Sequence, residues 1–499
     1  MSDMIINDSV PVDKKWSELI RYNIFIMKLV EFVVALLLNI LPHVVTPVDI
    51  LQCLVAGPTL MLTTQIMVLY VVDQVQYEAE FYYVIIQLLI TICAVINLFV
   101  IVAFSVILMY SDVKESREPK TNMKYPVILW WTLEFPGTSN VRHCSDSIKC
   151  YVYSDRLMSN IYNTEAYLFY ASNIDFKNLP IPRRPDEIIW ALFHEESPRN
   201  VEEFLHEKAL NLFNFSSTFS RHSNVPFPLQ HLYAYEDITS PRYFLSTQLK
   251  NELLKEIAPV LYLQSDCETS TERDAYVQEL MKHIKVDSYG KCLKNKDLPQ
   301  KFKEDYLNNL NEETFLHFIA RYKFVIAIEN GVCNDYVTEK FWRAIKVGTV
   351  PLYFGSPSIR DWFPNKKSGI LLEDYPTPKI LYEHIMELMK NDSLYEEYLE
   401  HKTKQIITNE NLINEYRQRP YQLDGIKTLE EFECFVCEKL YDKMRGETGV
   451  NVVNKSHYDC PKPISALTLG VNPHNSWVYS WETAESNAET IYKDIMNRD

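Results

Sequence analysis

Glycine is scarce in this chain: its 499 residues include only 11 glycines, beside 25 prolines and 23% charged residues. Collagen-like and low-complexity chains are rich in glycine and proline, so the composition excludes both classes and indicates folded domains. Positively charged residues are also fewer than negatively charged ones: 50 lysines and arginines stand against 66 aspartates and glutamates, which gives a net charge of −16. Such a chain repels phosphate backbones, so we expect no nucleic-acid partner.

Charged residues are absent from three stretches near the N-terminus, 32–48, 50–72 and 81–110. About 20 apolar residues suffice to cross a bilayer, so we predict a membrane region at 1–110 with one to three spans. The lysines and arginines that precede the first stretch predict a cytosolic N-terminus. An odd number of spans places the polar stem, 111–124, and everything after it in the lumen of the secretory pathway, whereas two spans place them in the cytosol.

Eight of the ten cysteines follow these stretches, which favours disulfides in an oxidising, lumenal compartment. The candidates are Cys144, Cys150, Cys267, Cys292, Cys333, Cys434, Cys437 and Cys460. Cys144 and Cys150 are spaced to close one short loop, and Cys434 and Cys437 another. The second pair also has the spacing of a redox pair or of half a zinc site. No second CxxC and no close histidine pair follows it, so we favour a structural disulfide.

Three sequons follow the same stretches and agree with a lumenal position. They make Asn214, Asn391 and Asn454 candidate glycosylation sites.

Compact apolar runs alternate with helical patterns after the stem. Buried strands are predicted at 125–131, 166–170, 188–193, 258–263, 324–328, 349–354 and 369–372. Alternating strands and helices indicate parallel α/β sheets, and the later strands have the layout of a nucleotide-binding half-domain. We therefore predict two Rossmann-like domains, at 125–312 and 313–446, that face a ligand cleft. The tail, 447–499, has no strong period and is predicted to be an appendage.

The segment Tyr322–Gly355 carries the strongest pattern of polar residues. A predicted strand delivers Asn330 at its carboxyl end, where open α/β sheets bind ligands. Thr338 is placed to cap a helix whose first turn holds Glu339 and Lys340. A helix N-terminus and a lysine together suit a phosphate, and a carboxylate beside them suits a reaction that builds positive charge on a sugar carbon. The spacing fits a capped surface helix equally well.

The same segment closely resembles the donor-site signature of the α1,3-fucosyltransferase family. The shared pattern is Asn330-x5-Tyr336-x-Thr338-Glu339-Lys340, then Trp342-Arg343 and Gly348-x-Val350-Pro351. The resemblance extends over 125–445 through WALFHEESPRN (190–200), LFNFSSTFSRHS (212–223), YLQSDC (262–267), Arg273, VDSYG (286–290) and the Cys434/Cys437 pair. The variants FHEESP, SDC and KNKDLP resemble the divergent branch with fucosyltransferases ten and eleven, which are regarded as protein O-fucosyltransferases.

This resemblance implies an inverting, metal-independent enzyme with the GT-B type of fold. The half that contains Asn330 would bind GDP-fucose, and the preceding half would bind the acceptor. The chain contains no Asp-x-Asp pair, the usual manganese-diphosphate motif of the other glycosyltransferase fold. By the family pattern, Lys340 and Arg273 hold the diphosphate, which suits the planar fork of an arginine. Asn330 and Tyr336 contact the donor, and Glu339 stabilises the transition state near the fucose.

An inverting transfer also needs a base for the acceptor hydroxyl, and Glu196 is the candidate. It follows the strand predicted at 188–193 and matches the family's Glu-Ser-Pro triplet. Glu195 and His194 adjoin it and carry groups that can act as bases, and the acids could instead cap a helix. Arg221 matches a family arginine and is either a donor or acceptor contact or a solvated surface residue.

The implied function is transfer of fucose from GDP-β-L-fucose to a hydroxyl of a secretory-pathway glycoprotein. The branch implies serine or threonine of small cysteine-rich domains of the EMI type, whereas the broader family implies α1,3-linkage to N-acetylglucosamine in glycans. The enzyme would sit in the endoplasmic reticulum or Golgi membrane with its catalytic part in the lumen, and no cofactor is implied. A single anchor is usual in the family, so several apolar runs indicate an unusual anchor or a misassembled gene model.

A protein of another class, a non-catalytic module that binds a glycan or a protein, is the alternative. The joint presence of the predicted site residues disfavours it, namely Glu196, Arg273, Asn330, Tyr336, Glu339 and Lys340.

Overall fold

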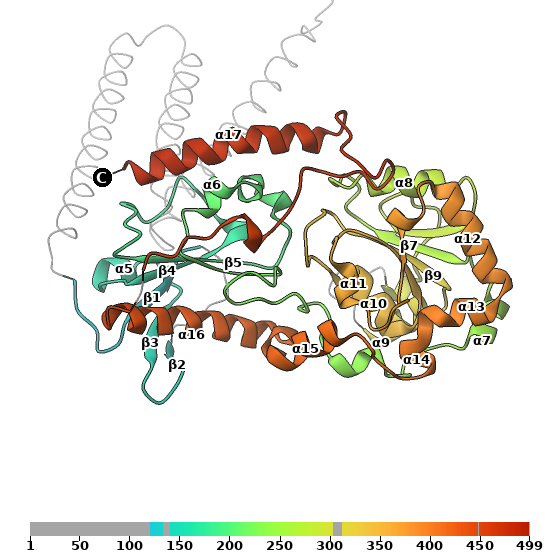
Figure 1. The fold of residues 1–499 in the computed structure, drawn as a ribbon, viewed down its shortest axis with the longest axis horizontal. Helices are drawn as coiled ribbons and strands as arrows, with labels where there is room; N and C mark the ends of the chain where they lie inside the picture. Colours follow the sequence, from blue (N-terminus) through green and yellow to red (C-terminus); the bar gives the residue numbers. More distant parts are fainter. Residues whose placement is uncertain (1–119, 133–139, 303–311, 448, 499) are drawn as a thin grey trace, which may run out of the picture. The chain divides into compact units, whose positions relative to one another are not determined.

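The structure, a computed structural model, describes residues 120–132, 140–302, 312–447 and 449–498 (Figure 1). The predicted membrane spans and most of the predicted stem lie outside these residues. Among the helices that are described, none is both long and apolar enough to cross a membrane. Lys120–Asp499 form one unit of the chain, and the description below concerns that unit.

A six-stranded sheet occupies the first half of this unit, in the order β2-β3-β1-β4-β5-β6. Its strands are β1 (Val127–Trp130), β2 (Asn140–His143), β3 (Lys149–Tyr153), β4 (Ala166–Tyr170), β5 (Ile189–His194) and β6 (Phe215–Thr218). All neighbours are parallel except β2, which forms an antiparallel hairpin with β3. The strands predicted at 125–131, 166–170 and 188–193 coincide with β1, β4 and β5, which are buried on both faces as parallel strands usually are.

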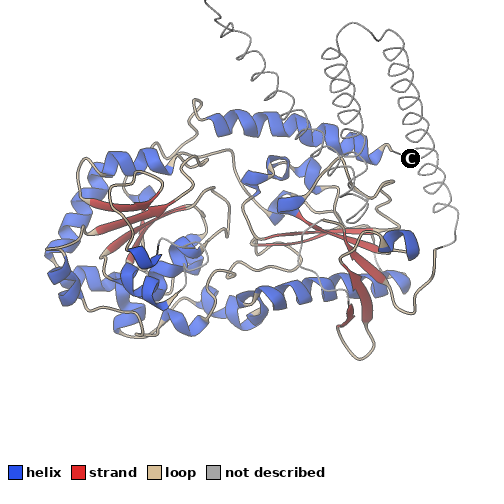
Figure 2. Cartoon of the chain, turned by 180° about the vertical axis from the view of Figure 1, so that it is seen from behind, coloured by secondary structure: helices blue, strands red, loops and turns tan. Residues whose placement is uncertain are grey.

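A five-stranded parallel sheet forms the second half, in the order β11-β10-β9-β7-β8 (Figure 2). Its strands are β7 (Val260–Gln264), β8 (Val286–Gly290), β9 (Phe324–Ile328), β10 (Val350–Phe354) and β11 (Ile370–Leu371). The main helices are α8 (Arg273–Leu280), α9 (Glu313–Ala320), α10 (Glu339–Val347) and α12 (Pro378–Lys390). Alternate residues of β9 face different helices: Ile326 and Ile328 pack with α8 and α12, and Val325 and Ala327 with α9 and α10. The prediction of an α/β fold with two parallel-sheet halves is confirmed.

The two halves do not divide at residue 312, where we predicted the boundary. Strands β7 and β8 precede that position but belong to the second sheet, where Val260 lies opposite Phe324. Helix α16 (Gly425–Met444) lies beyond it but packs its Phe432 and Val436 on the first sheet. A strand–helix alternation looks the same on both sides of a division, so the sequence pattern could not show which sheet each strand joins.

The C-terminal tail packs against both halves, and its last helix covers the first. Helix α17 (Ser476–Met496) lies against η4 (Glu202–Leu205) and α6 (Glu207–Leu210). Its Ala488 and Ile495 join a core with Leu129 of β1. The next residue, Trp130, faces the opposite side of the sheet and meets α16. Helices α16 and α17 therefore cover opposite faces of the six-stranded sheet, as Figure 1 also shows.

Four disulfides are present among the described residues, and two of them overturn the predicted pairing. Cys144 pairs with Cys434 and Cys150 with Cys437, so neither short loop is closed. Cys434 and Cys437 lie one turn apart on α16 and face the β2–β3 hairpin, which presents the other two cysteines. The remaining disulfides are Cys267–Cys292 and Cys333–Cys460. The CxxC spacing is therefore neither a redox pair nor half a zinc site.

Candidate active site

The carboxyl ends of β5 and β9, one from each sheet, meet through two side-chain hydrogen bonds. The hydroxyl of Tyr336 donates to Oε2 of Glu196 over 2.7 Å. The hydroxyl of Ser197 donates to Oδ1 of Asn330 over 3.1 Å. Glu196 and Ser197 follow β5, and Asn330 follows β9. The structure thus brings the predicted base together with two of the predicted donor contacts.

Tyr336 is held as a hydrogen-bond donor. Burial, and then the charge of Glu196, raise the pKa of its hydroxyl well above its usual value, so the proton stays on the tyrosine. Its side chain is buried, and its ring packs on that of Phe219 at 4.9 Å between centroids. One oxygen of Glu196 is therefore fixed by a rigid partner from the other half of the unit.

The two alternatives to Glu196 have different surroundings. Glu195 accepts a short hydrogen bond from the hydroxyl of Tyr170, and burial raises the pKa of its carboxyl. His194 is fully buried, its Nδ1 lies 2.9 Å from the hydroxyl of Tyr458, and burial lowers its pKa to about 3. Among the described residues, Glu196 is the one of the three whose side chain forms a hydrogen bond with the second half's loop at 329–340.

A buried carboxylate fixes the N-terminus of α10. Oε1 of Glu329 accepts a hydrogen bond from the backbone N–H of Thr338 at 2.8 Å, and Oε2 accepts one from its hydroxyl at 2.7 Å. The Nζ of Lys340 lies 3.4 Å from Oε2 of Glu329 and 3.3 Å from Oε1 of Glu339. Because Glu329 is fully buried and engaged on both oxygens, it sets the position of the whole turn.

The charges in this turn stabilise one another. Burial on its own lowers the pKa of Lys340, but the carboxylates of Glu339 and Glu329 outweigh it and raise that pKa. Burial on its own raises the pKa of Glu339, but the charges of Lys340 and Arg343 outweigh it and lower that pKa strongly. Lys340 therefore stays protonated and Glu339 stays ionised at neutral pH. A cation at a helix N-terminus suits a diphosphate, and an ionised carboxylate beside it suits a cationic sugar.

Arg273 supplies a second cation at the same edge of the sheet. Its Nη1 donates to the carbonyl of Ile328, the last residue of β9, over 3.4 Å, and its Nη2 donates to the carbonyl of Asp266. Its charge also acts on the pKa of Lys340, which places the two cations close together. The buried Nε of Arg273 has no hydrogen-bond partner among the described residues. A buried guanidinium with an unpaired N–H group suits an anionic ligand.

Arg221 joins the halves of the unit at some distance from this cluster. Its guanidinium forms hydrogen bonds of 2.6–3.0 Å with both oxygens of Asp335 and lies 2.8 Å from Asp361. The ring of Trp362 lies under it at 4.5 Å. Asp335 precedes Tyr336 and has a left-handed backbone with φ of 65°. Arg221 thus holds the loop that carries Tyr336.

The charges of the cluster also act on His231, although nothing in the sequence around it indicated a site. Burial lowers the pKa of its imidazole, and the charges of Glu339, Lys340 and Glu196 all act on it. It reaches the cluster from the irregular segment after β6. Only the folded arrangement brings it there, so no local pattern could have found it.

The three candidate glycosylation sites differ in exposure. Asn391 and Asn454 are exposed and cap short helices. Asn214 is 5% exposed, and its Oδ1 accepts hydrogen bonds from Nη2 of Arg183 at 2.7 Å and from the backbone N–H of Trp190 at 2.9 Å. A buried amide with this role has no room for a glycan, so the prediction for Asn214 is at odds with the fold.

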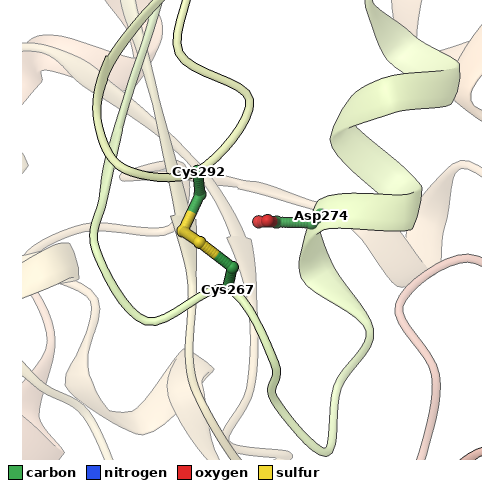
Figure 3. Close-up of side chains that lie close together, drawn as sticks. All are labelled: Cys267, Asp274 and Cys292. Atoms are coloured by element: carbon green, nitrogen blue, oxygen red, sulfur yellow. A yellow bond between two sulfur atoms is a disulfide. The ribbon is translucent and has the colours of Figure 1, made fainter. Parts of the chain in front are cut away.

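One group among the described residues has the spacing of a metal site, formed by Cys267, Asp274 and Cys292 (Figure 3). Its two sulfurs are joined in a disulfide, and its carboxylate accepts a hydrogen bond from the hydroxyl of Tyr262. Metals bind thiolates rather than disulfide sulfurs, so this group is a structural crosslink.

Comparison with known proteins gives matches along most of the described chain. Residues 123–230 match the family model "Fucosyltransferase, N-terminal", and residues 254–456 match "Glycosyltransferase family 10 (fucosyltransferase) C-term". GDP-fucose protein O-fucosyltransferase 3 of Homo sapiens is 40% identical over 74% of this chain and 79% of its own. The proteins of that name from Gallus gallus and Danio rerio are 39% and 36% identical over 76% and 77% of this chain and 81% and 85% of theirs.

A solved structure of an α1,3-fucosyltransferase with GDP is also similar, at 16% identity. It has a TM-score of 0.35 and covers 63% of this chain and 96% of its own.

Proposed function

This chain belongs to glycosyltransferase family 10, the fucosyltransferases, and is a GDP-fucose-dependent enzyme; we propose that it transfers fucose to serine or threonine of folded, cysteine-rich protein domains, with Glu196 as the base. The observation that carries the site assignment is the hydrogen bond from Tyr336 to Glu196. Glu196 follows a strand in the part of the chain that matches the N-terminal fucosyltransferase model. Tyr336 lies in a loop of the part that matches the C-terminal model, so the hydrogen bond joins the two parts.

The proposed reaction is a single displacement. Glu196 takes the proton of the acceptor hydroxyl while that oxygen attacks C1 of the fucose. The bond from C1 to the β-phosphate oxygen breaks, and GDP departs with both bonding electrons. The new bond forms on the face opposite the departing GDP, so the configuration at C1 inverts.

Lys340 and Arg273 are proposed to bind the diphosphate and to stabilise the negative charge on the departing GDP. Lys340 is protonated at neutral pH and sits at the N-terminus of α10, and Arg273 offers a buried N–H without a partner among the described residues. The two cations carry out here the charge neutralisation for which other glycosyltransferases use manganese. The ionised Glu339 beside them stabilises the positive charge that develops on the sugar.

Asn330 and Tyr336 are proposed as donor contacts, and Arg221 as a residue that positions the donor loop. Relatives of this chain are protein O-fucosyltransferases by name, which supports a protein acceptor. The resemblance to one branch of the family narrows the proposal to domains of the EMI type. Four disulfides support a site of action in the oxidising lumen of the endoplasmic reticulum or Golgi.

The test is mass spectrometry of fucose transfer by the full chain from GDP-fucose to two kinds of acceptor. One is a panel of folded cysteine-rich domains that includes an EMI domain, and the other is a set of glycans ending in N-acetylglucosamine. We expect fucose on serine or threonine of the folded domains. Glu196→Gln should lower turnover by at least about 100-fold, and Glu195→Gln, the matched control, by much less. Transfer to the glycans alone would show that the acceptor is a glycan and not a protein domain. Equal losses of turnover in Glu196→Gln and Glu195→Gln would contradict the role of Glu196 as the base.

A further inference from the structure

A small pocket is lined by Ser197, the residue that follows the candidate base, and the C-terminal tail forms much of its wall. Ser197 and Gly331, the neighbours of Glu196 and Asn330, line one side of it. Trp477 and Trp481 of α17 line another. The tail, 447–499, therefore reaches the residues that adjoin Glu196 and Asn330 in the chain.

Three sets of contacts hold this part of the tail in place. The Cys333–Cys460 disulfide joins it to the loop between Asn330 and Tyr336. The side-chain amide of Asn475 donates to the carbonyl of Ser270 over 3.0 Å, which ties the start of α17 to the second half. The carbonyl of Trp481 lies 2.8 Å from Nε2 of His206 in the first half. Because the tail is fixed to both halves, the pocket is a preformed part of the fold.

The walls of the pocket are mainly apolar, with a few polar side chains among them. Leu205, Val332, two prolines and the Cys333–Cys460 disulfide line it together with the tryptophans, and Arg199, Glu202 and Ser270 are the polar members of the lining beside Ser197. The guanidinium of Arg199 lies over the ring of Trp477 at 5.0 Å.

The size of the pocket separates two kinds of occupant. Its volume is about 30 Å³. A cavity that holds a benzene ring has roughly 150 Å³, so a six-membered sugar ring does not fit inside. A branch of one aliphatic side chain does.

We propose that this pocket is an acceptor subsite that binds an aliphatic side chain flanking the fucosylated serine or threonine of a protein. The inference rests on the proposed function, because it assumes that the acceptor oxygen lies at Glu196. It assigns to the tail a role in choosing the acceptor, and it makes the local sequence around the hydroxyl a determinant of specificity.

The test compares tail variants of the full chain on one folded EMI-type domain that the unchanged enzyme modifies. Trp477→Ala and Trp481→Ala should each raise the acceptor KM by roughly tenfold, because each removes a large apolar wall of the subsite. Their affinity for GDP by calorimetry and their rate of GDP-fucose hydrolysis should stay within about twofold, since the donor residues are untouched. Tyr479→Ala is the matched control, because Tyr479 lies on the same helix with 73% of its side chain exposed.

A second variant fills the pocket without removing any wall. A Cβ on Gly331 would lie 3.5 Å from Oγ of Ser197 and 3.7 Å from Oγ of Ser270, which is ordinary contact. Gly331→Ala is therefore accommodated, and Gly331→Leu should block the subsite and raise the acceptor KM more than Gly331→Ala does. Replacing the aliphatic neighbours of the modified hydroxyl by alanine should raise the KM of the unchanged enzyme and leave that of Trp477→Ala almost unaffected.

The outcomes separate the two proposals. An enzyme without transfer to any protein domain contradicts the proposed function itself. An active enzyme whose acceptor KM is the same in both tryptophan variants as in Tyr479→Ala contradicts the subsite alone. A rise in KM for a glycan acceptor equal to that for the protein domain would show a sugar site instead, and would also overturn the inference.

Discussion

Tyr336 and Glu196 come from different halves of the enzyme, 140 positions apart, and share a hydrogen bond of 2.7 Å. The bond is possible because Tyr336 keeps its proton: its burial and the neighbouring carboxylate both raise the pKa of the hydroxyl. A buried donor of this kind holds Glu196 in one orientation and leaves its other oxygen for the acceptor. The two halves are therefore joined at the residue that we propose as the base.

Removal of this hydroxyl should slow the reaction without weakening donor binding to the same degree. We expect Tyr336→Phe to lower kcat by about 10- to 100-fold, because a misoriented base loses much of its effect. Steady-state kinetics and calorimetry with GDP would measure the two quantities. Tyr170→Phe is the matched control, since that hydroxyl donates to Glu195 instead. A larger loss of kcat in Tyr170→Phe than in Tyr336→Phe would assign the base to Glu195.

Lys340 should contribute to GDP binding directly. Lys340→Met removes a cation that the surrounding carboxylates keep protonated, and it takes a positive partner from both Glu329 and Glu339. We expect GDP affinity to fall by roughly 10- to 100-fold, since a hydrogen bond to a charged group contributes about 1.5–3 kcal/mol. Lys346→Met, at the other end of the same helix, should bind GDP normally by calorimetry. Equal affinities in the two variants would exclude Lys340 from the phosphate site.

The disulfide pairing predicts for which pairs of cysteine substitutions the losses in the free energy of unfolding are additive. Cys144→Ser and Cys434→Ser should each lower the free energy of unfolding by about 2–5 kcal/mol, and the double variant should lose no more than either one. Cys144→Ser combined with Cys150→Ser should lose more than either, because those two residues belong to different disulfides. Thermal melting would give the ranking, and peptide mapping without reduction would identify the bonds. Additive losses for Cys144 and Cys434 would contradict the pairing.

Local patterns sufficed to predict the donor segment. The strand at 324–328, the cap at Thr338, the helix that follows and its end at Gly348 all depend on residues within one stretch of chain, and the structure has each of them. The same holds for β1, β4 and β5 of the first sheet, whereas β2, β3 and β6 were not predicted. In these places the period of the apolar residues, the cap and the glycine with positive φ agree with one another.

Contacts between distant residues could not be predicted in this way. The partners of Cys434 and Cys437 lie nearly 300 positions earlier, and helix α16 faces them only after the chain has crossed back to the first sheet. His231 has no motif around it, and Trp477 and Trp481 belong to a tail without a strong period. Each of these residues acquires its surroundings from packing at long range, which the pattern of one segment does not encode.

Lys250 is a buried lysine outside the site, and its titration should contribute to the pH dependence of stability. Burial, and then the charge of Lys323, lower its pKa from 10.5 to about 7. Between these values the unfolded chain holds a proton that the folded chain has released, so stability rises with pH, by up to about 1.4 kcal/mol per unit. The free energy of unfolding in urea should therefore increase from pH 7 to 9 by more in the unchanged protein than in Lys250→Met, with the exposed Lys255→Met as control. If the free energy of unfolding of the unchanged protein rises by no more than that of Lys250→Met from pH 7 to 9, Lys250 remains charged in the folded protein.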